Sequence, residues 1–325
     1  QGARTMDINR RTALKGIGAG LLASGSLTAI QQTYAAENPA GVKVGMCDWN
    51  LGGSCNPELI PKAKEAHLEG IQVSVGLSAN NIPLRKPEVR ERYLALGKEY
   101  GIEFCSVAAG GILNAIPLAT EPQSAMYVLD AIEAAKALGS SCTLLAFFGE
   151  ADLRLSYPGG NYGTNEEYRN IGKDPAWREW ELDTMKVRRV VDFLRQIVPR
   201  AEDAGVILGI ENMLSAAQNL DIIDRAGGSP MLQVYYDVGN STGAGYDVPA
   251  EIHLLGRDRI CEVHLKDNKT RIFGTPDAQV NMAACAKAFK EIGYSKWYVL
   301  ETSGRDKQFL PDTQANVAFA KKTFG

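Results

Sequence analysis

The sequence predicts a (β/α)8 TIM barrel in a single domain. Eight short runs rich in β-branched and aromatic residues alternate with eight segments whose apolar residues recur at helical spacing. Near-continuous apolar strands joined by helical crossovers are typical of a parallel sheet covered on its outer side. Eight such units in about 285 residues favour a closed barrel over a doubly wound open sheet, which is the alternative. No linker-like stretch and no run of charges divides the chain.

The predicted strands are short and end in turn formers or polar residues. They cover residues 42–49, 71–76, 102–110, 142–149, 206–212, 232–239, 260–267 and 297–303. The predicted helices repeat apolar residues near i, i+3, i+4 and i+7, and several end with the glycine that favours a helix C-terminus. They cover residues 57–70, 86–101, 124–140, 186–205, 216–228, 248–258, 280–294 and 312–325.

One connection is much longer than the others. Residues 149–185 separate the fourth predicted strand from its helix, whereas such loops usually contain about 2–6 residues. A long insertion at this end of a barrel predicts a lid, and its aromatic residues, including Tyr157 and Trp177, are expected to stack on a sugar. The alternative is an extra helix or hairpin that packs its own aromatic residues.

The first 36 residues have a different composition. "QGART" before Met6 is interpreted as an expression remnant, and Arg10-Arg11 precede a weakly apolar run that ends near Ala35-Ala36. This order predicts a twin-arginine signal peptide, so that a mature domain of residues 37–325 would be exported, to the periplasm. The alternative is a chance arginine pair before an amphipathic helix. No other stretch is apolar enough to predict a membrane span.

The overall charge and the cysteines exclude several classes of protein. A formal net charge of -3 gives no cationic surface for nucleic acid or anionic lipid, so we expect a small-molecule partner. The six cysteines have no CxxC or zinc-finger spacing, and most lie in apolar runs. We therefore predict free, mostly buried thiols, with Cys47 and Cys55 the pair close enough in sequence to question.

Ionisable residues close four consecutive predicted strands. Glu211, Asp237, His264 and Glu301 end the fifth to eighth strands, where the active-site groups of a (β/α)8 barrel project. Three converging carboxylates would repel one another unless a cation compensates them. One imidazole and three carboxylates favour Mn²⁺, Mg²⁺, Co²⁺ or Zn²⁺. The four residues together predict a divalent metal site, although any one of them alone would more often cap a helix or form a salt bridge.

The motifs "GIEN", "YYDVGN", "EVHLKDN" and "VLETS" at these strand ends resemble the xylose-isomerase-like TIM barrels known as sugar phosphate isomerases/epimerases. That group includes ketose 3-epimerases, inosose dehydratases and hydroxypyruvate isomerases, and the resemblance covers about residues 42–325. It implies that Glu211, Asp237, His264 and Glu301 bind one divalent metal, most often Mn²⁺. It also implies that Glu211 and Glu301 are the catalytic acid/base pair.

The resemblance also suggests substrate-binding residues. Many epimerases have a histidine where this chain has Asn240, and Arg271 is a loose match to an arginine that often follows the seventh strand. Lys266 and Asp267 are expected either to face the substrate or to fix the turn after His264. Trp49, which ends the first predicted strand, completes the expected binding set.

The implied reaction is sugar isomerisation or epimerisation through a metal-stabilised enediolate. One glutamate would remove the proton beside the carbonyl and the other would deliver it. Export favours a non-phosphorylated sugar or keto-sugar. A lyase or dehydratase acting on a keto-sugar or 3-keto-glycoside would need the same residues, and a non-catalytic sugar-binding barrel is a further alternative. A homo-oligomer stays open, whereas three histidines are too few for a trinuclear-zinc apurinic endonuclease.

Overall fold

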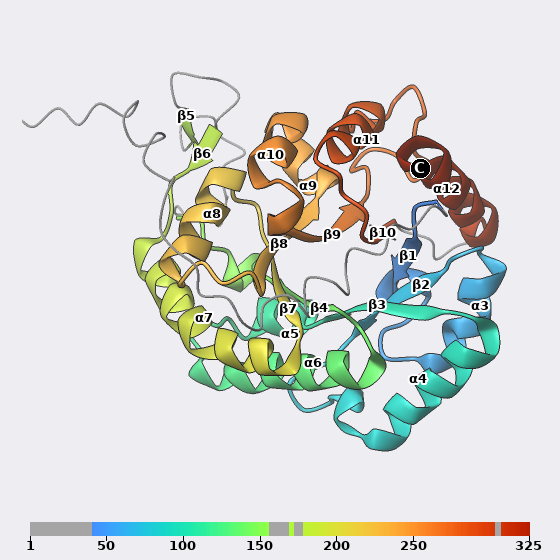
Figure 1. The fold of residues 1–325 in the computed structure, drawn as a ribbon, viewed down its shortest axis with the longest axis horizontal. Coiled ribbons are helices and arrows are strands. Elements are labelled where there is room, and N and C mark those ends of the chain that lie inside the picture. The colour runs from blue at the N-terminus through green and yellow to red at the C-terminus, as the bar shows by residue number, and fades with distance from the viewer. Residues whose placement is uncertain (1–40, 156–168, 172–177, 303–306) are drawn as a thin grey trace, which may run out of the picture. The chain divides into compact units, whose positions relative to one another are not determined.

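The computed structural model describes residues 41–155, 169–171, 178–302 and 307–325. Gly41–Gly325 form one compact unit. Within the described residues, eight parallel strands close into a barrel in the order in which they follow one another along the chain. Helices surround these strands (Figure 1). The predicted (β/α)8 fold is confirmed.

The barrel strands are almost wholly buried, and each begins within two residues of its predicted start. They are β1 (Val44–Cys47), β2 (Gly70–Ser74), β3 (Glu103–Ala108), β4 (Cys142–Ala146), β7 (Ile207–Glu211), β8 (Leu232–Asp237), β9 (Ile260–Leu265) and β10 (Tyr298–Leu300). Strand β10 pairs with β1 and closes the barrel, with Met46 opposite Leu300.

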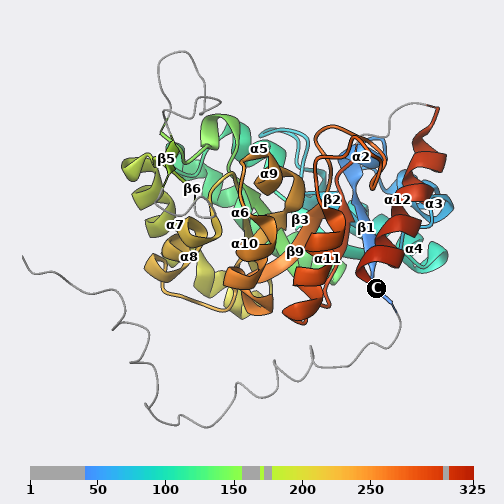
Figure 2. The same ribbon diagram turned by 90° about the horizontal axis from the view of Figure 1, so that it is seen from above.

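Each predicted helix is present outside the barrel. These helices are α3 (Ile60–Glu65), α4 (Pro87–Tyr100), α6 (Ala125–Leu138), α7 (Thr184–Ala204), α8 (Ala216–Arg225), α10 (Val248–Leu255), α11 (Met282–Glu291) and α12 (Phe309–Phe324). Three short helices follow strands directly and were not predicted: α2 (Asp48–Leu51), α5 (Gly110–Ala115) and α9 (Val238–Gly243). They lie together on one side of the barrel (Figure 2). That side holds the carboxyl ends of the strands, so these helices surround the site described below.

Successive side chains of a strand point alternately to the outside and to the inside of the barrel, which gives two separate buried layers. In β2, Ile71 and Val73 belong to the large apolar core that includes residues of the surrounding helices. Gln72, between them, points to the barrel interior, where it contacts His264. Every barrel strand can therefore bury apolar groups on its outer face and still present polar groups inside.

Part of the insertion after β4 is an extra hairpin, one of the two forms considered for it. Strands β5 (Arg169–Ile171) and β6 (Arg178–Trp180) pair antiparallel. Trp180 is buried against Ala244 and Tyr246, so this aromatic ring packs internally. Tyr157 and Trp177 lie outside the described residues, and the lid remains a prediction.

The cysteines agree with the prediction from the sequence. All six thiols are free, and only Cys55 is half-buried rather than buried. Among the described helices none is long and apolar enough to cross a bilayer. The segment interpreted as a twin-arginine signal lies outside the described residues, so export is untested by the structure.

Candidate metal centre

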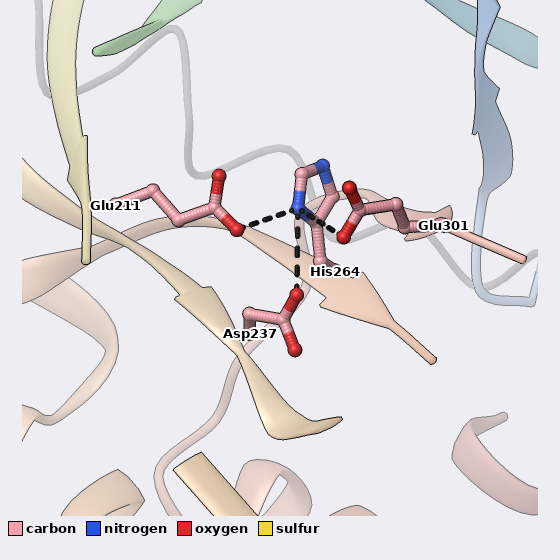
Figure 3. Close-up of side chains that lie close together, drawn as sticks. All are labelled: Glu211, Asp237, His264 and Glu301. Carbon is pink, nitrogen blue, oxygen red and sulfur yellow. Dashed lines mark hydrogen bonds and ion pairs between the residues drawn. The ribbon is translucent and has the colours of Figure 1, made fainter. Parts of the chain in front are cut away.

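The four strand-end residues converge at the barrel mouth. Glu211, Asp237, His264 and Glu301 each offer a ligand atom, and these atoms all lie within 4.8 Å of one another. His264 Nδ1 is 3.1 Å from Glu211 Oε1, 3.8 Å from Asp237 Oδ2 and 3.6 Å from Glu301 Oε2. Figure 3 shows the two glutamates on opposite sides of the imidazole, with the aspartate between them. The side chain of His264 is fully buried, and that of Glu301 is 21 % exposed.

Local hydrogen bonds fix the position of Glu211. Its carbonyl oxygen accepts from Phe147 N, which extends the pairing of β7 with β4. The following residue, Asn212, turns the chain because its Oδ1 accepts from Leu214 N at 2.9 Å. Ser215 then begins α8 with a capping box. The Asn of "GIEN" thus belongs to the turn and the Glu to the site.

Asp237 combines two roles in one carboxylate. Its Oδ1 accepts from Asn240 N at 2.7 Å and caps the N-terminus of α9. Its Oδ2 is buried, lies 3.8 Å from His264 Nδ1 and pairs with the Lys266 ammonium at 3.0 Å. A carboxylate oxygen has more than one lone pair, so Oδ2 can bind a metal ion beside this ion pair. This atom therefore fits a metal ligand.

Burial and neighbouring charges act on the pKa of His264 in opposite directions. Burial by itself would lower its pKa, but the carboxylates of Glu211 and Glu301 outweigh burial and raise the pKa to about 9. In the metal-free protein the imidazole is therefore protonated and donates from Nδ1 to Glu211 Oε1. A divalent cation can replace this proton because Nδ1 is the ring nitrogen that faces the carboxylates.

Lys266 adds a second positive charge. Its Nζ is 2.7 Å from Glu301 Oε2 and 3.0 Å from Asp237 Oδ2. Burial would lower the pKa of Lys266, but the two carboxylates raise it well above its usual value, so the lysine is charged. The Lys266 ammonium and one divalent ion together balance three carboxylates. The donor set fits a hard divalent metal.

A chain of buried polar residues leads away from His264 into the barrel. His264 Nε2 is 3.0 Å from Gln72 Oε1, and Gln72 Nε2 is 3.0 Å from Ser106 Oγ. Ser106 Oγ is 3.2 Å from Tyr235 OH, which donates to Glu262 Oε2 at 2.7 Å. These residues were not predicted. The available signal was spacing, since Glu262 and Tyr235 each lie two residues before a ligand on the same strand.

The expected substrate-binding residues divide into two groups. Trp49 packs edge-on to His264 with ring centroids 6.3 Å apart, and Asn240 is the half-buried residue whose N–H binds Asp237. Asp267 holds the turn after His264, because its oxygens accept from four backbone N–H groups. Arg271 Nη2 is 3.3 Å from Asp312 Oδ2 of α12, and a contact of Arg271 with substrate stays a prediction.

Comparisons with known proteins agree with this fold. The xylose isomerase-like TIM barrel family matches residues 60–323. A 2-epi-5-epi-valiolone 7-phosphate 2-epimerase from Actinoplanes sp. is 25% identical over 239 residues, which are 72% of this chain and 74% of that protein.

Solved structures of two epimerases share the fold. D-psicose 3-epimerase from Clostridium cellulolyticum has a TM-score of 0.66 at 14% identity, covering 87% of this chain and 99% of that one. The 3-keto-D-glucoside 4-epimerase from E. coli has a TM-score of 0.66 at 15% identity, covering 86% of this chain and 99% of that one. The chain therefore belongs to the xylose isomerase-like TIM barrel family.

Proposed function

We propose that this protein is a divalent-metal-dependent epimerase or isomerase of a non-phosphorylated sugar or keto-sugar. The observation that carries the proposal is the position of two glutamates on opposite sides of His264, with Nδ1 3.1 Å from Glu211 and 3.6 Å from Glu301. A site for binding alone has no need of two facing carboxylates. Such a pair suits removal of a proton on one side of a carbon and delivery on the other.

The residues have separate tasks in this proposal. Glu211, Asp237, His264 and Glu301 would hold the cation, which supplies stabilisation for the negative charge that develops on the substrate oxygens. One glutamate removes the proton from the carbon beside the carbonyl. The other returns it, to the opposite face in an epimerase or to the neighbouring carbon in an isomerase. Lys266, which pairs with Glu301 Oε2, would bind a substrate oxygen.

Two considerations support a substrate without a phosphate. The predicted twin-arginine segment would place the enzyme in the periplasm, where sugar phosphates are scarce. Lys266 already pairs with two ligand carboxylates, which suits contact with one substrate oxygen more than with a phosphate dianion. D-psicose and a 3-keto-glucoside, the sugars that appear in the names of the two structural relatives, are therefore the first substrates to test.

Deuterium incorporation tests the proposed proton transfer. Ketohexoses and 3-keto-glucosides are incubated in D₂O with Mn²⁺-loaded enzyme, and mass spectrometry measures exchange of the carbon-bound proton. Glu211→Gln and Glu301→Gln should each lower the rate by about 10²–10⁴-fold, the usual contribution of a general acid or base. Glu291→Gln, an exposed carboxylate on α11, is the matched control and should exchange like the wild type. Undiminished exchange in both site variants would refute the acid/base assignment.

A lyase is the second candidate, and Lys266 is the observation that favours it. A cation 2.7 Å from Glu301 Oε2 can stabilise charge on a leaving group β to the carbonyl as well as on a substrate oxygen. The two candidates differ in their products from a 3-keto-glucoside. Release of the aglycone would identify a lyase, whereas an intact glycoside with inverted configuration would identify an epimerase.

A further inference from the structure

The insertion after β4 is joined to the barrel by a short stem, residues 152–155 and 180–183. The two segments of the stem pair through backbone hydrogen bonds and through a β-bridge between Arg154 and Leu182. The guanidinium of Arg154 lies over the ring of Trp180, 4.7 Å from its centroid. Strand β6, which Trp180 ends, lies beside α8 (Figures 1 and 2). The stem is therefore a paired and packed element at the barrel mouth.

The ring of Trp180 packs against the chain segments that follow two of the strand-end carboxylates. Trp180 is 6 % exposed and forms one apolar cluster with Ala244 and Tyr246 of the connection between α9 and α10. Met213, in the connection between β7 and α8, packs against the same cluster. One side chain of the stem therefore brings together two connections that lie far apart in the sequence.

Two hydrogen bonds hold the same segments. Tyr246 OH donates to Met213 O at 2.9 Å and joins the two connections directly. Gln218 Nε2, in the first turn of α8, donates to Trp180 O at 2.7 Å. The ring of Trp180 helps to keep water away from the bond between Tyr246 and Met213, and a hydrogen bond shielded from water is stronger. Packing and hydrogen bonds thus support each other at this point.

The side chain of Gln218 serves two partners at once. Its Oε1 accepts from Ser215 N at 3.2 Å and closes the capping box of α8. A glutamate could close the same box, but an ionised carboxylate has no proton to donate to Trp180. Gln218 is only 8 % exposed, so solvent has little access to replace the stem as its partner. The amide therefore suits the contact with the stem as well as the helix cap.

We propose that Trp180 is a positioning residue of the metal site, which clamps the connection after Glu211 to the end of the helix that Asp237 caps. Gln218 and Tyr246 are its partners in this clamp. Metal ligands must be held within about 0.5 Å of their binding geometry, so a connection that moves after loss of the clamp weakens binding. The inference rests on the proposed metal site, and it adds that metal affinity depends on the insertion after β4.

Truncation of the ring tests the clamp. Phe104→Ala is the matched control for Trp180→Ala, because Phe104 is an aromatic residue that is 7 % exposed and packs on Tyr93 from β3, a strand without any of the four ligands. Both variants should lower the Tm. Titration with Co²⁺ at pH 7.5, followed by absorbance, should give a Kd about tenfold weaker for Trp180→Ala and within about twofold of the wild type for Phe104→Ala. Equal losses in the two variants, or no loss in Trp180→Ala, would overturn the proposal.

Hydrogen exchange tests the clamp in the metal-free protein. Gln218→Glu keeps the capping box and, as an ionised carboxylate at pH 8, loses the bond to Trp180. Mass spectrometry should show that the backbone amides of residues 212–216 exchange at least about tenfold faster in Gln218→Glu and in Trp180→Ala, because this connection opens more often. Gln196→Glu, the same change at an exposed position of α7, should exchange like the wild type. Unchanged exchange in both clamp variants would contradict the proposal.

These readouts separate the clamp from the proposed function. A wild type that binds no Co²⁺ would refute the metal site and, with it, the positioning role. Exchange in residues 212–216 is measured without metal, so unchanged exchange in the clamp variants would overturn the clamp even where the wild type binds Co²⁺. Circular dichroism verifies that every variant is folded.

Discussion

The two ring nitrogens of His264 have different surroundings. Nδ1 faces three carboxylates at 3.1 to 3.8 Å, and Nε2 faces the carbonyl oxygen of Gln72 at 3.0 Å. Trp49 and Tyr235 pack against the ring, which restricts its rotation. The sequence predicts the histidine as a metal ligand from its place at a strand end. Which nitrogen would bind the metal became clear only from these contacts.

This arrangement predicts how the stability of the metal-free protein depends on pH. Burial opposes the charged imidazole, but Glu211 and Glu301 raise the pKa of His264 to about 9, above the value of about 6.5 in an unfolded chain. A raised pKa stabilises the fold fully below pH 6.5, and the contribution is lost as the pH rises through 9. The Tm of the metal-free protein should therefore fall more steeply between pH 6.5 and 9 than that of His264→Gln. If calorimetry shows that the Tm of both proteins falls equally with pH, the pH dependence does not come from His264.

A saturating divalent metal should remove this loss of stability with rising pH. The metal must displace the His264 proton, so its affinity rises with pH over the same range. The Tm difference between metal-loaded and metal-free protein should therefore grow from pH 6.5 to pH 9, at constant free metal concentration. A difference independent of pH would show that His264 gives up no proton on binding.

At the scale of elements, the direct junction of β8 with α9 holds Asp237 beside Lys266. Gly239 makes this approach feasible, because a Cβ there would lie 2.5 Å from Lys266 Cγ and 2.8 Å from the Lys266 carbonyl oxygen. The Asn268 side chain donates to the carbonyl of Gly239 at 2.8 Å and joins the two turns. The motifs "YYDVGN" and "HLKDN" therefore describe a single packed unit made from two strand ends.

Gly239→Ala should disturb this unit. Since one of the crowded atoms belongs to the backbone, the start of α9 must shift and carry the Asp237 cap with it. We expect a loss of about 1–3 kcal/mol in the free energy of unfolding, the usual cost of overpacking, and weaker metal binding. Gly111→Ala in α5 is the control, since nothing lies within 4 Å of its added Cβ, and it should be neutral or slightly stabilising. Equal urea unfolding curves for the two variants would contradict the packing argument.

The elements also show where sequence reasoning reached its limit. The strands were predictable because each apolar run is several residues long, whereas its predicted boundaries are uncertain by only a few residues. The short helices α2, α5 and α9 were missed because they have too few residues for a helical repeat to appear. Asp267 looked like a site residue by its place after His264. Its carboxylate instead accepts hydrogen bonds from four backbone N–H groups, which extend from nearby residues such as Thr270 to Val280. Such long-range contacts have no local signature.

At the scale of the whole molecule, barrel closure creates the site. Strands β7 to β10 are consecutive neighbours, so their strand-end residues could be predicted to meet from the fold class alone. Gln72 and His264 are 192 residues apart, on strands that are not neighbours in the barrel. Their contact crosses the barrel interior, and no pattern within β2 indicates it. That the four strand-end residues meet was therefore predictable, and the contact of Gln72 with His264 was not.

The central claim is that Glu211, Asp237, His264 and Glu301 bind one divalent metal, and elemental mass spectrometry tests it most directly. After reconstitution with Mn²⁺ and removal of free metal, the wild type should retain about one equivalent. His264→Ala should retain almost none. His253→Ala, which removes an exposed histidine paired with Glu291, should retain as much as the wild type. A wild type without bound metal, or equal retention in His264→Ala, would contradict the account.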